Sequence, residues 1–218
     1  MDYADGGDLA KRIAELQTRN KGKPEVAKDY FSEEQILHWF TQICLSLKHC
    51  HDRKIMHRDI KALNVFLTAN DIVKLGDFGI ARVMQTTNEM AATVVGTPYY
   101  LSPEIVQNNS YDNKSDVWSI GVLLYELCAL RPPFNGQNIH QLAIQIVSGK
   151  YPAIDERRYS PELLKLVDML LTVEPENRPN VNELLRFPIL RHRAEAFLDT
   201  DLFFQEFSHT VLHQQQIF

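Results

Sequence analysis

One stretch of eight residues, HRDIKALN at 57–64, constrains this chain more than any other part of its sequence. It places His57, Arg58, Asp59, Lys61 and Asn64 between two apolar segments, the pair at 55–56 and the run at 65–67. A solvated loop does not need apolar neighbours on both sides. A buried segment tolerates such a centre only when every polar group has a partner. The stretch therefore predicts a prepared polar site held between two parts of a core.

The bulk composition is that of a globular protein. The 218 residues are 44% hydrophobic and 23% charged, which suffices for one large domain or two small ones. A formal net charge of -5 gives no support to a nucleic-acid surface. The three cysteines, Cys44, Cys50 and Cys128, form no CxxC pair, which argues against a disulfide framework and a zinc site and favours a reducing compartment.

Neither a membrane span nor a signal peptide is expected. The most apolar run, WSIGVLLYELCAL at 118–130, is shorter than the roughly 20 residues of a membrane span and contains Glu126. We therefore expect a buried helix there. The amino-terminal residues MDYADGGDLAKR contain no apolar stretch of the kind that a signal peptide needs.

Hydrophobic spacing predicts a mainly helical chain with one hairpin. Asp8 is a candidate N-cap for a first helix, and Ser32 begins a capping box for a long second helix with an apolar stripe at 36, 40, 43 and 47. The segments VFLT and IVKL flank the turn ANDI and predict a hairpin. Later helices are expected at 115–130, 138–148, 160–172 and 180–186, after an irregular loop at 77–104.

Three side chains with oxygen ligands are expected to meet across the hairpin. Asp59 and Asn64 precede it, and Asp77 follows it in the sequence GDFG. Because a hairpin returns the chain to its start, the two turns can face each other. Carboxylate and amide oxygens suit Mg²⁺, which usually keeps phosphate oxygens and waters in its shell. Together with the charge of Lys61, this set suits phosphoryl transfer.

Each of these motifs alone is more often a simple turn former, but their combination is specific. HRDxxxxN, then DFG, then a loop closed by SPE matches the protein-kinase signature in order and spacing. The chain resembles the eukaryotic protein kinases, and within them the NIMA-related (Nek) serine/threonine kinases, most like the Nek1-type branch. The segments that carry the resemblance are HRDIKALNVFLT, KLGDFGIARV, VGTPYYLSPEI, YDNKSDVWSIGVLLYELCAL, MDYADGGDL and HDRKI.

The resemblance implies a protein kinase-like (α+β) fold. Residues 1–198 would form the hinge and the mainly α-helical C-terminal lobe with its short β-hairpin, and residues 199–218 would form a flanking tail. SPE stands where most kinases have APE, and Nek kinases commonly have SPE at this position. The resemblance is weakest over about 17–31, where the loop NKGKPEVAKDY is longer than usual.

Catalytic roles follow from the same resemblance. Asp59 would be the base, Lys61 would contact the transferring phosphate, and Thr97 would hydrogen-bond both. Asn64 and Asp77 would hold Mg²⁺. The backbones of Asp2 and Ala4 would bind the adenine of ATP above Phe66, and Met1 would gate the pocket behind it.

Regulatory and structural roles follow as well. Thr93 would be the activating phosphosite, because a phosphate carrying a charge of roughly -2 suits the guanidinium of Arg58; the alternative is an ordinary exposed threonine. His57 and Phe78 would pack in an internal stack that reports the active state. The structural anchors would be Glu104 with Arg178, and Asp116 with the catalytic-loop backbone.

The small N-terminal lobe of a kinase is expected to be absent from these residues. The sequence has no GxGxxG loop and no VAIK-like lysine, and Gly6 and Gly7 lack the strand and spacing of a phosphate loop. We therefore expect this polypeptide alone to be weak or inactive. The alternative function is a non-catalytic binding or scaffold module.

The remaining expectations concern partners and location. Protein substrates with a Ser or Thr acceptor are expected, without nucleic acid or membrane, and with any dimerisation region outside this chain. The location would be cytoplasmic, with the centrosome, cilium or nucleus possible by resemblance. A metal cluster at Cys44, His49, Cys50 and His51 is a third, disfavoured interpretation, since both cysteines fit a helix core.

Overall fold

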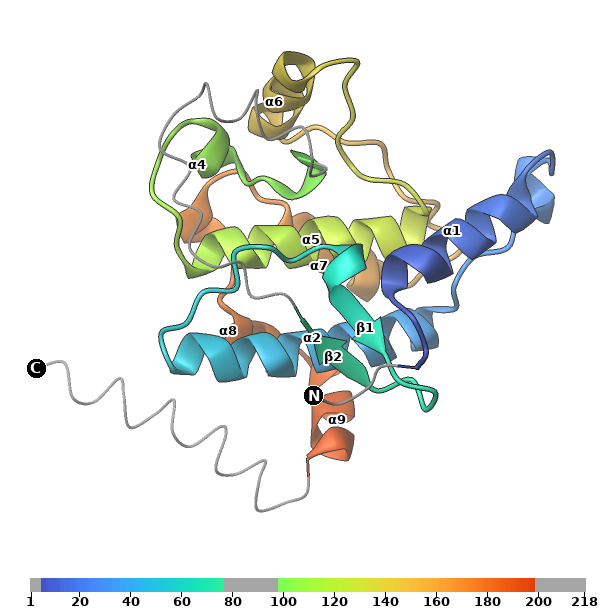
Figure 1. Ribbon diagram of the computed structural model, residues 1–218, viewed down its shortest axis with the longest axis horizontal. Coiled ribbons are helices and arrows are strands. Elements are labelled where there is room, and N and C mark those ends of the chain that lie inside the picture. The colour runs from blue at the N-terminus through green and yellow to red at the C-terminus, as the bar shows by residue number, and fades with distance from the viewer. Residues whose placement is uncertain (1–4, 77–97, 199–218) are drawn as a thin grey trace, which may run out of the picture.

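A computed structural model describes residues 5–76 and 98–198. Over these ranges the chain is mainly helical with one two-stranded sheet (Figure 1). The α-helices are α1 (Leu9–Asn20), α2 (Glu33–Asp52), α4 (Pro103–Val106), α5 (Asn113–Ala129), α6 (Ile139–Ser148), α7 (Pro161–Leu170), α8 (Val181–Leu184) and α9 (Pro188–Phe197). The strands are β1 (Val65–Leu67) and β2 (Val73–Leu75), and short 3₁₀ turns lie at Glu25–Ala27, Ala62–Asn64, Pro98–Tyr100 and Pro175–Asn177.

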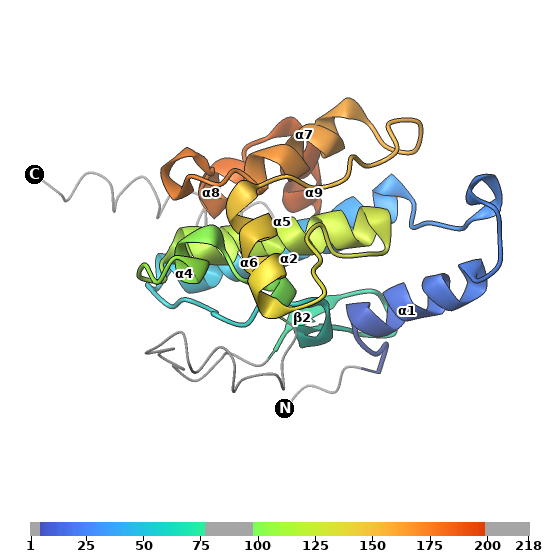
Figure 2. The ribbon, with the colours of Figure 1, turned by 90° about the horizontal axis from the view of Figure 1, so that it is seen from above.

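The helices α2 and α5 pack against each other at the centre of the fold. The predicted apolar stripe of α2 is fully buried. α5 is buried on nearly all sides, as expected for an apolar helix that crosses a core. α9 and α8 cover α2, while α7 packs on α5 (Figures 1 and 2). The run after the octet is part of this core through Val65 and Leu67, but the pair before it is not, because Ile55 is 49% exposed.

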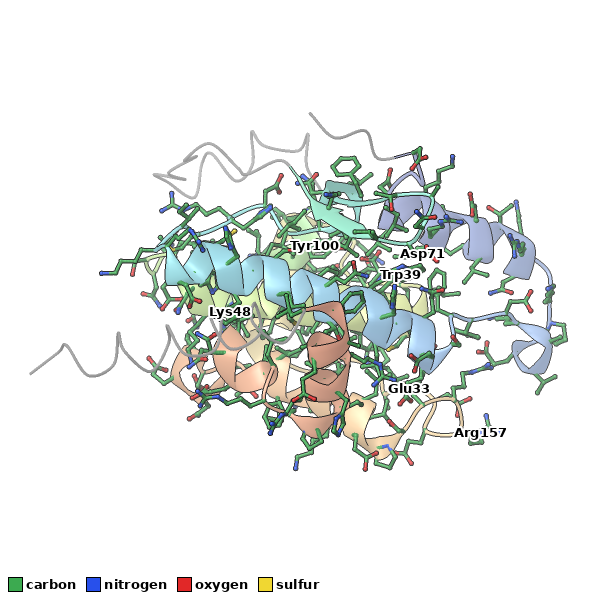
Figure 3. All side chains as sticks on the ribbon, turned by 90° about the horizontal axis from the view of Figure 1, so that it is seen from below. Glu33, Trp39, Lys48, Asp71, Tyr100 and Arg157 are labelled. Carbon is green, nitrogen blue, oxygen red and sulfur yellow. The ribbon has the colours of Figure 1, made fainter. Side chains whose placement is uncertain are left out.

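The helix starts follow the local capping chemistry. Asp8 accepts from the Lys11 N–H at 2.8 Å, and Ser32 accepts from the Gln35 N–H at 3.2 Å, so both predicted N-caps are present. Glu33, at the start of α2 (Figure 3), also accepts from the backbone and hydroxyl of Ser160, the N-cap of α7. One glutamate thereby ties the starts of two helices together.

The predicted hairpin is present as an antiparallel pair, with Val65 opposite Leu75 and Leu67 opposite Val73. The amino-terminal segment adds to it, because Gly6 N–H donates to the Leu67 carbonyl and Leu67 N–H donates to the Gly7 carbonyl, both at 2.8 Å. A Cβ atom on Gly6 would lie 2.6 Å from the carbonyl oxygen of Thr68. Gly6 is thus required for close approach of two backbones.

Some elements differ from the sequence prediction. α9 was not predicted, because only Leu190 and Ala194 of this helix are buried and the rest of its apolar pattern is weak. α4 begins inside the segment expected to be irregular, since Pro103 at its first turn suits a helix start. α5 begins two residues earlier than predicted, where Asp112 and Ser115 form a capping box.

Within the described ranges, none of the helices combines the length and the apolar character that crossing a bilayer requires.

Candidate active site

The octet forms the connection between the end of α2 and strand β1. Its central contacts converge on the carboxylate of Asp59. Lys61 Nζ lies 2.8 and 3.0 Å from the two carboxylate oxygens, and Asn64 Nδ2 lies 2.8 Å from Oδ2. The Asp59 side chain is 43% exposed, so its carboxylate is held in place while still open to solvent.

The orientation of Asn64 leaves its oxygen for another partner. Asn64 is buried, and its amide nitrogen donates to both the carboxylate and the backbone carbonyl of Asp59. These bonds fix which end of the amide faces Asp59. The amide oxygen Oδ1 is therefore free of that contact and is the kind of ligand that Mg²⁺ prefers. Asn64 fits the predicted metal role.

The second turn of the predicted site comes close to the first. The Gly76 N–H donates to the Asn64 carbonyl at 3.0 Å, so the residue before Asp77 is bonded directly to the octet. A Cβ atom on Gly76 would lie 2.7 Å from the ring of Phe66, which explains why glycine stands there. Asp77 itself lies outside the described residues.

Asp116, near the start of α5, holds the backbone of the octet. Its carboxylate accepts from the N–H groups of His57 and Arg58, each at 3.0 Å, and from His51 Nε2 at 2.8 Å. Tyr111 adds a fourth hydrogen bond from its hydroxyl. Burial alone would raise the pKa of Asp116, but these four hydrogen bonds outweigh it and leave the pKa below its usual value.

The backbone of Arg58 adopts a left-handed conformation, with φ of +68°. This conformation is uncommon for a residue other than glycine, and the hydrogen bond from its N–H to Asp116 helps to hold it. The Arg58 side chain is exposed, and its guanidinium carbon lies 5.8 Å from the centre of the Tyr111 ring. Arg58 therefore presents a charge at the surface from a fixed backbone.

Glu104 and Arg178 form a buried, bidentate ion pair. Arg178 Nη1 and Nη2 donate to the two carboxylate oxygens at 2.9 and 2.8 Å, and the arginine is 1% exposed. Burial tends to raise the pKa of Glu104, but the hydrogen bonds from Arg178 and Ser115 lower it below its usual value. The pair joins α4 to the segment before α8 across a span of 74 residues.

A polar contact that the sequence did not predict lies beside the octet. The Tyr100 hydroxyl accepts from the Ala62 N–H at 3.1 Å and donates to the carboxylate of Glu126 in α5 (Tyr100 is labelled in Figure 3). Burial raises the pKa of both Tyr100 and Glu126. The one feature of the sequence that pointed to this contact was Glu126, an acidic residue inside the most apolar run of the chain.

Other predicted site residues are placed as follows. His57 is fully buried, and Phe66 in β1 is half-buried. Seven residues lie outside the described ranges, namely Met1, Asp2, Ala4, Asp77, Phe78, Thr93 and Thr97. Their predicted roles stay predictions.

The histidines and cysteines of α2 have structural partners. Cys44 is buried in the core, and burial raises the pKa of its thiol. His51 bonds Asp116, and His49 contacts Arg53. In the part of the chain that the structure describes, no group of three or more His, Cys, Asp or Glu side chains is arranged to hold a metal ion.

The site and the helical fold define a protein kinase. A model of the protein kinase domain matches residues 1–190, and the chain therefore belongs to the protein kinase family. Among its relatives are Nek kinases, as the sequence motifs indicated. It is 50% identical to human serine/threonine-protein kinase Nek5 over 97% of this chain, and 50% identical to mouse serine/threonine-protein kinase Nek1 over 95%. Human Nek2 is 45% identical over 87% of the chain.

The chain spans only part of these relatives. It covers 28% of the length of human Nek5, 16% of mouse Nek1 and 42% of human Nek2.

Proposed function

We propose that this chain carries the catalytic machinery of a protein serine/threonine kinase. The observation that carries the proposal is the carboxylate of Asp59, which Lys61 and Asn64 hold from two sides while it remains open to solvent. A base for a substrate hydroxyl needs this combination of fixed position and access. The serine/threonine kinase relatives support the same function.

In the proposed reaction, a Ser or Thr hydroxyl of a protein substrate attacks the γ-phosphorus of ATP. Its proton passes to a carboxylate oxygen of Asp59. The bond from the γ-phosphorus to the bridging oxygen breaks, and ADP leaves with the electron pair. Lys61, already within 3.0 Å of Asp59, offsets negative charge on the group in transfer. Thr97 is proposed to hydrogen-bond these two side chains.

Asn64 and Asp77 are proposed to hold Mg²⁺. The ion, when bound, neutralises phosphate charge. The contribution of the chain is to fix the amide oxygen of Asn64 by tying its nitrogen to Asp59. Phe66 is proposed to lie under the adenine, with the backbones of Asp2 and Ala4 as its hydrogen-bonding partners.

Arg58 is proposed to bind a phosphate on Thr93. The exposed guanidinium stands on a backbone that Asp116 fixes, and it offers the charge that a phosphate needs as a partner. Phosphatase treatment should lower the kinase activity of the wild type and leave the activity of the Arg58→Gln variant unchanged. Equal sensitivity in both would reject this role.

These 218 residues, as a separate polypeptide, are proposed to transfer phosphate weakly. They contain none of the glycine-rich and lysine motifs that cover the phosphates in kinases. We infer a cytoplasmic location, with the centrosome, cilium or nucleus as candidate sites of action. Imaging of the tagged protein tests this location.

The deciding experiment is phosphoryl transfer from labelled ATP with Mg²⁺ to dephosphorylated β-casein. Wild type is compared with Asp59→Asn and Asp77→Ala, and with Val26→Glu as a control at a site 89% exposed. Label above both site variants supports the kinase function. If joining an amino-terminal kinase lobe to the chain also gives no label above the site variants, the function fails and a binding module is favoured.

A further inference from the structure

A groove with a volume of about 340 Å³ lies between α1 and the amino-terminal half of α2. The loop at 30–32 and the hairpin turn complete its lining. Trp39 on α2 and Asp71 in the turn, both labelled in Figure 3, line it. None of the described active-site residues does so. Concave sites of this size with aromatic side chains and a few polar groups typically bind small molecules.

Trp39 brings a buried hydrogen-bond donor without a partner to this groove. The residue is 3% exposed, and its ring packs edge-on against Phe31 with the ring centres 5.2 Å apart. Its indole N–H is buried and donates to no acceptor within the described ranges. The large majority of buried polar side-chain atoms have a partner, because leaving one unpaired costs stability. An acceptor supplied by a ligand would remove that cost.

Arg12 adds a cation without a partner from the opposite wall of the groove. The residue is half-buried, and its buried Nε has no acceptor in the part of the chain that the structure describes. Its hydrogen bond there comes from the backbone, whose N–H donates to the Asp8 carbonyl at 3.2 Å. A guanidinium presents several N–H donors in a fixed plane, a geometry that matches a carboxylate. The two unpaired donors therefore call for an anionic acceptor.

The other charges of the groove limit how much negative charge a ligand can carry. Arg19 adds a second cation, but the acids Glu15 and Asp71 also line the groove and would repel a ligand with several negative charges. A single carboxylate fits this balance better than a phosphate does. Leu16 and Phe31 supply an apolar part of the lining, which suits an aromatic or apolar ligand body.

We propose that the groove between α1 and α2 binds a small organic carboxylate with an aromatic or apolar body. The carboxylate oxygens accept from the Arg12 guanidinium and from the Trp39 indole N–H, and the body packs on Leu16 and Phe31. Because the indole N–H is buried, the ligand reaches it through a small movement of the half-buried Gln35, which lies one turn before Trp39 and lines the same groove. This site is independent of the proposed phosphoryl transfer.

The test is an NMR titration of the ¹⁵N-labelled full chain with 3-phenylpropionate, in which the two indole N–H signals are followed. Trp118 is the internal reference, because it is fully buried and does not line the groove. Trp39→Phe removes one signal and so assigns both. We expect the Trp39 signal to move downfield as its N–H gains an acceptor, while the Trp118 signal stays in place. The expected Kd is about 1 mM, a usual value for a ligand of this size.

Arg12→Gln should weaken binding about tenfold, the loss of one hydrogen bond to a charged group. Arg157→Gln, at a side chain that is 84% exposed and outside the groove, should not change it.

The ligand controls use the wild type alone, so they decide the proposal even if a variant fails to fold. The neutral amide 3-phenylpropanamide should bind about tenfold more weakly than the acid, and inorganic phosphate should leave the Trp39 signal in place. A Trp39 signal that does not move at about ten times the expected Kd would overturn the site. Equal binding of acid and amide, or a response to phosphate equal to that with the acid, would overturn the carboxylate class.

Discussion

The side-chain amide of Asn64 donates two hydrogen bonds to Asp59, one to its carboxylate and one to its backbone carbonyl, each at 2.8 Å. Asn64→Asp keeps an oxygen ligand but replaces the donor with a second negative charge. We expect a loss of kcat of roughly 10- to 100-fold, the equivalent of one hydrogen bond to a charged group. Transfer kinetics at rising Mg²⁺ measure it, with Leu63→Ala, an exposed neighbour, as control. Full activity at high Mg²⁺ would show that the donor is dispensable.

The buried pair of Glu104 and Arg178 should dominate local stability. Arg178→Met leaves the carboxylate without its partner, and we expect a loss of about 3–5 kcal/mol in the free energy of unfolding. Urea denaturation measures it. The double variant with Glu104→Gln should lose less than the sum of the single variants. Arg191→Met, which breaks an exposed pair with Glu195, should cost less than about 1 kcal/mol. Equal costs at the two sites would contradict the interpretation.

Glu126 should make stability fall as pH rises. Its pKa in the folded protein is raised by burial, so the folded state holds its proton at a pH where the unfolded chain has released it. Stability is therefore lost as pH rises from about 4.5 through the folded pKa. The free energy of unfolding of Glu126→Gln, relative to that of wild type, should be higher at about pH 7 than at about pH 4. Urea denaturation at both pH values measures it. A difference that does not depend on pH would reject this.

Asp116, unlike Glu126, should make stability fall as pH is lowered. Its folded pKa is lowered, so the stability it provides is present above its unfolded pKa and is lost as pH falls through the folded value. Asp116→Asn keeps one oxygen acceptor but leaves N–H groups of the octet unpaired, at a cost of about 1–3 kcal/mol. Its unfolding free energy should depend less on acid pH than that of wild type. Parallel curves for the two proteins would argue against a charged Asp116.

The sequence could predict those parts of the fold whose pattern is local. Ser32 and Asp8 mark helix starts, and the two short apolar segments on either side of a turn mark the hairpin. The kinase motifs brought Asp59 and Asn64 into one predicted site, since they lie only five residues apart. In each case the residues that interact are close in the chain, so spacing alone carries the information.

Contacts between distant residues were harder to predict from the local pattern, and only the family resemblance implied the contacts of Glu104 with Arg178 and of Asp116 with the backbone of the octet. Tyr100 and Glu126 are 26 residues apart, and His51 and Asp116 are 65 apart. The sequence around one residue of such a pair does not identify its partner, because the tertiary fold decides which buried polar groups must pair. The helix α9 escaped prediction for a related reason: it packs on α2, but only Leu190 and Ala194 of its own sequence are buried, so its apolar pattern is weak.

The four hydrogen bonds on Asp116 also link the backbone of the octet to the packing of α5 on α2. The amides of His57 and Arg58 are bonded to a side chain 59 and 58 residues further along the chain. They are therefore protected from exchange with solvent deuterium only after α5 has docked on the end of α2. Their exchange rates should match those of the slowest core amides, because local fraying cannot expose them without separating the two central helices. We therefore expect the geometry of the octet to be lost only when the whole fold unfolds.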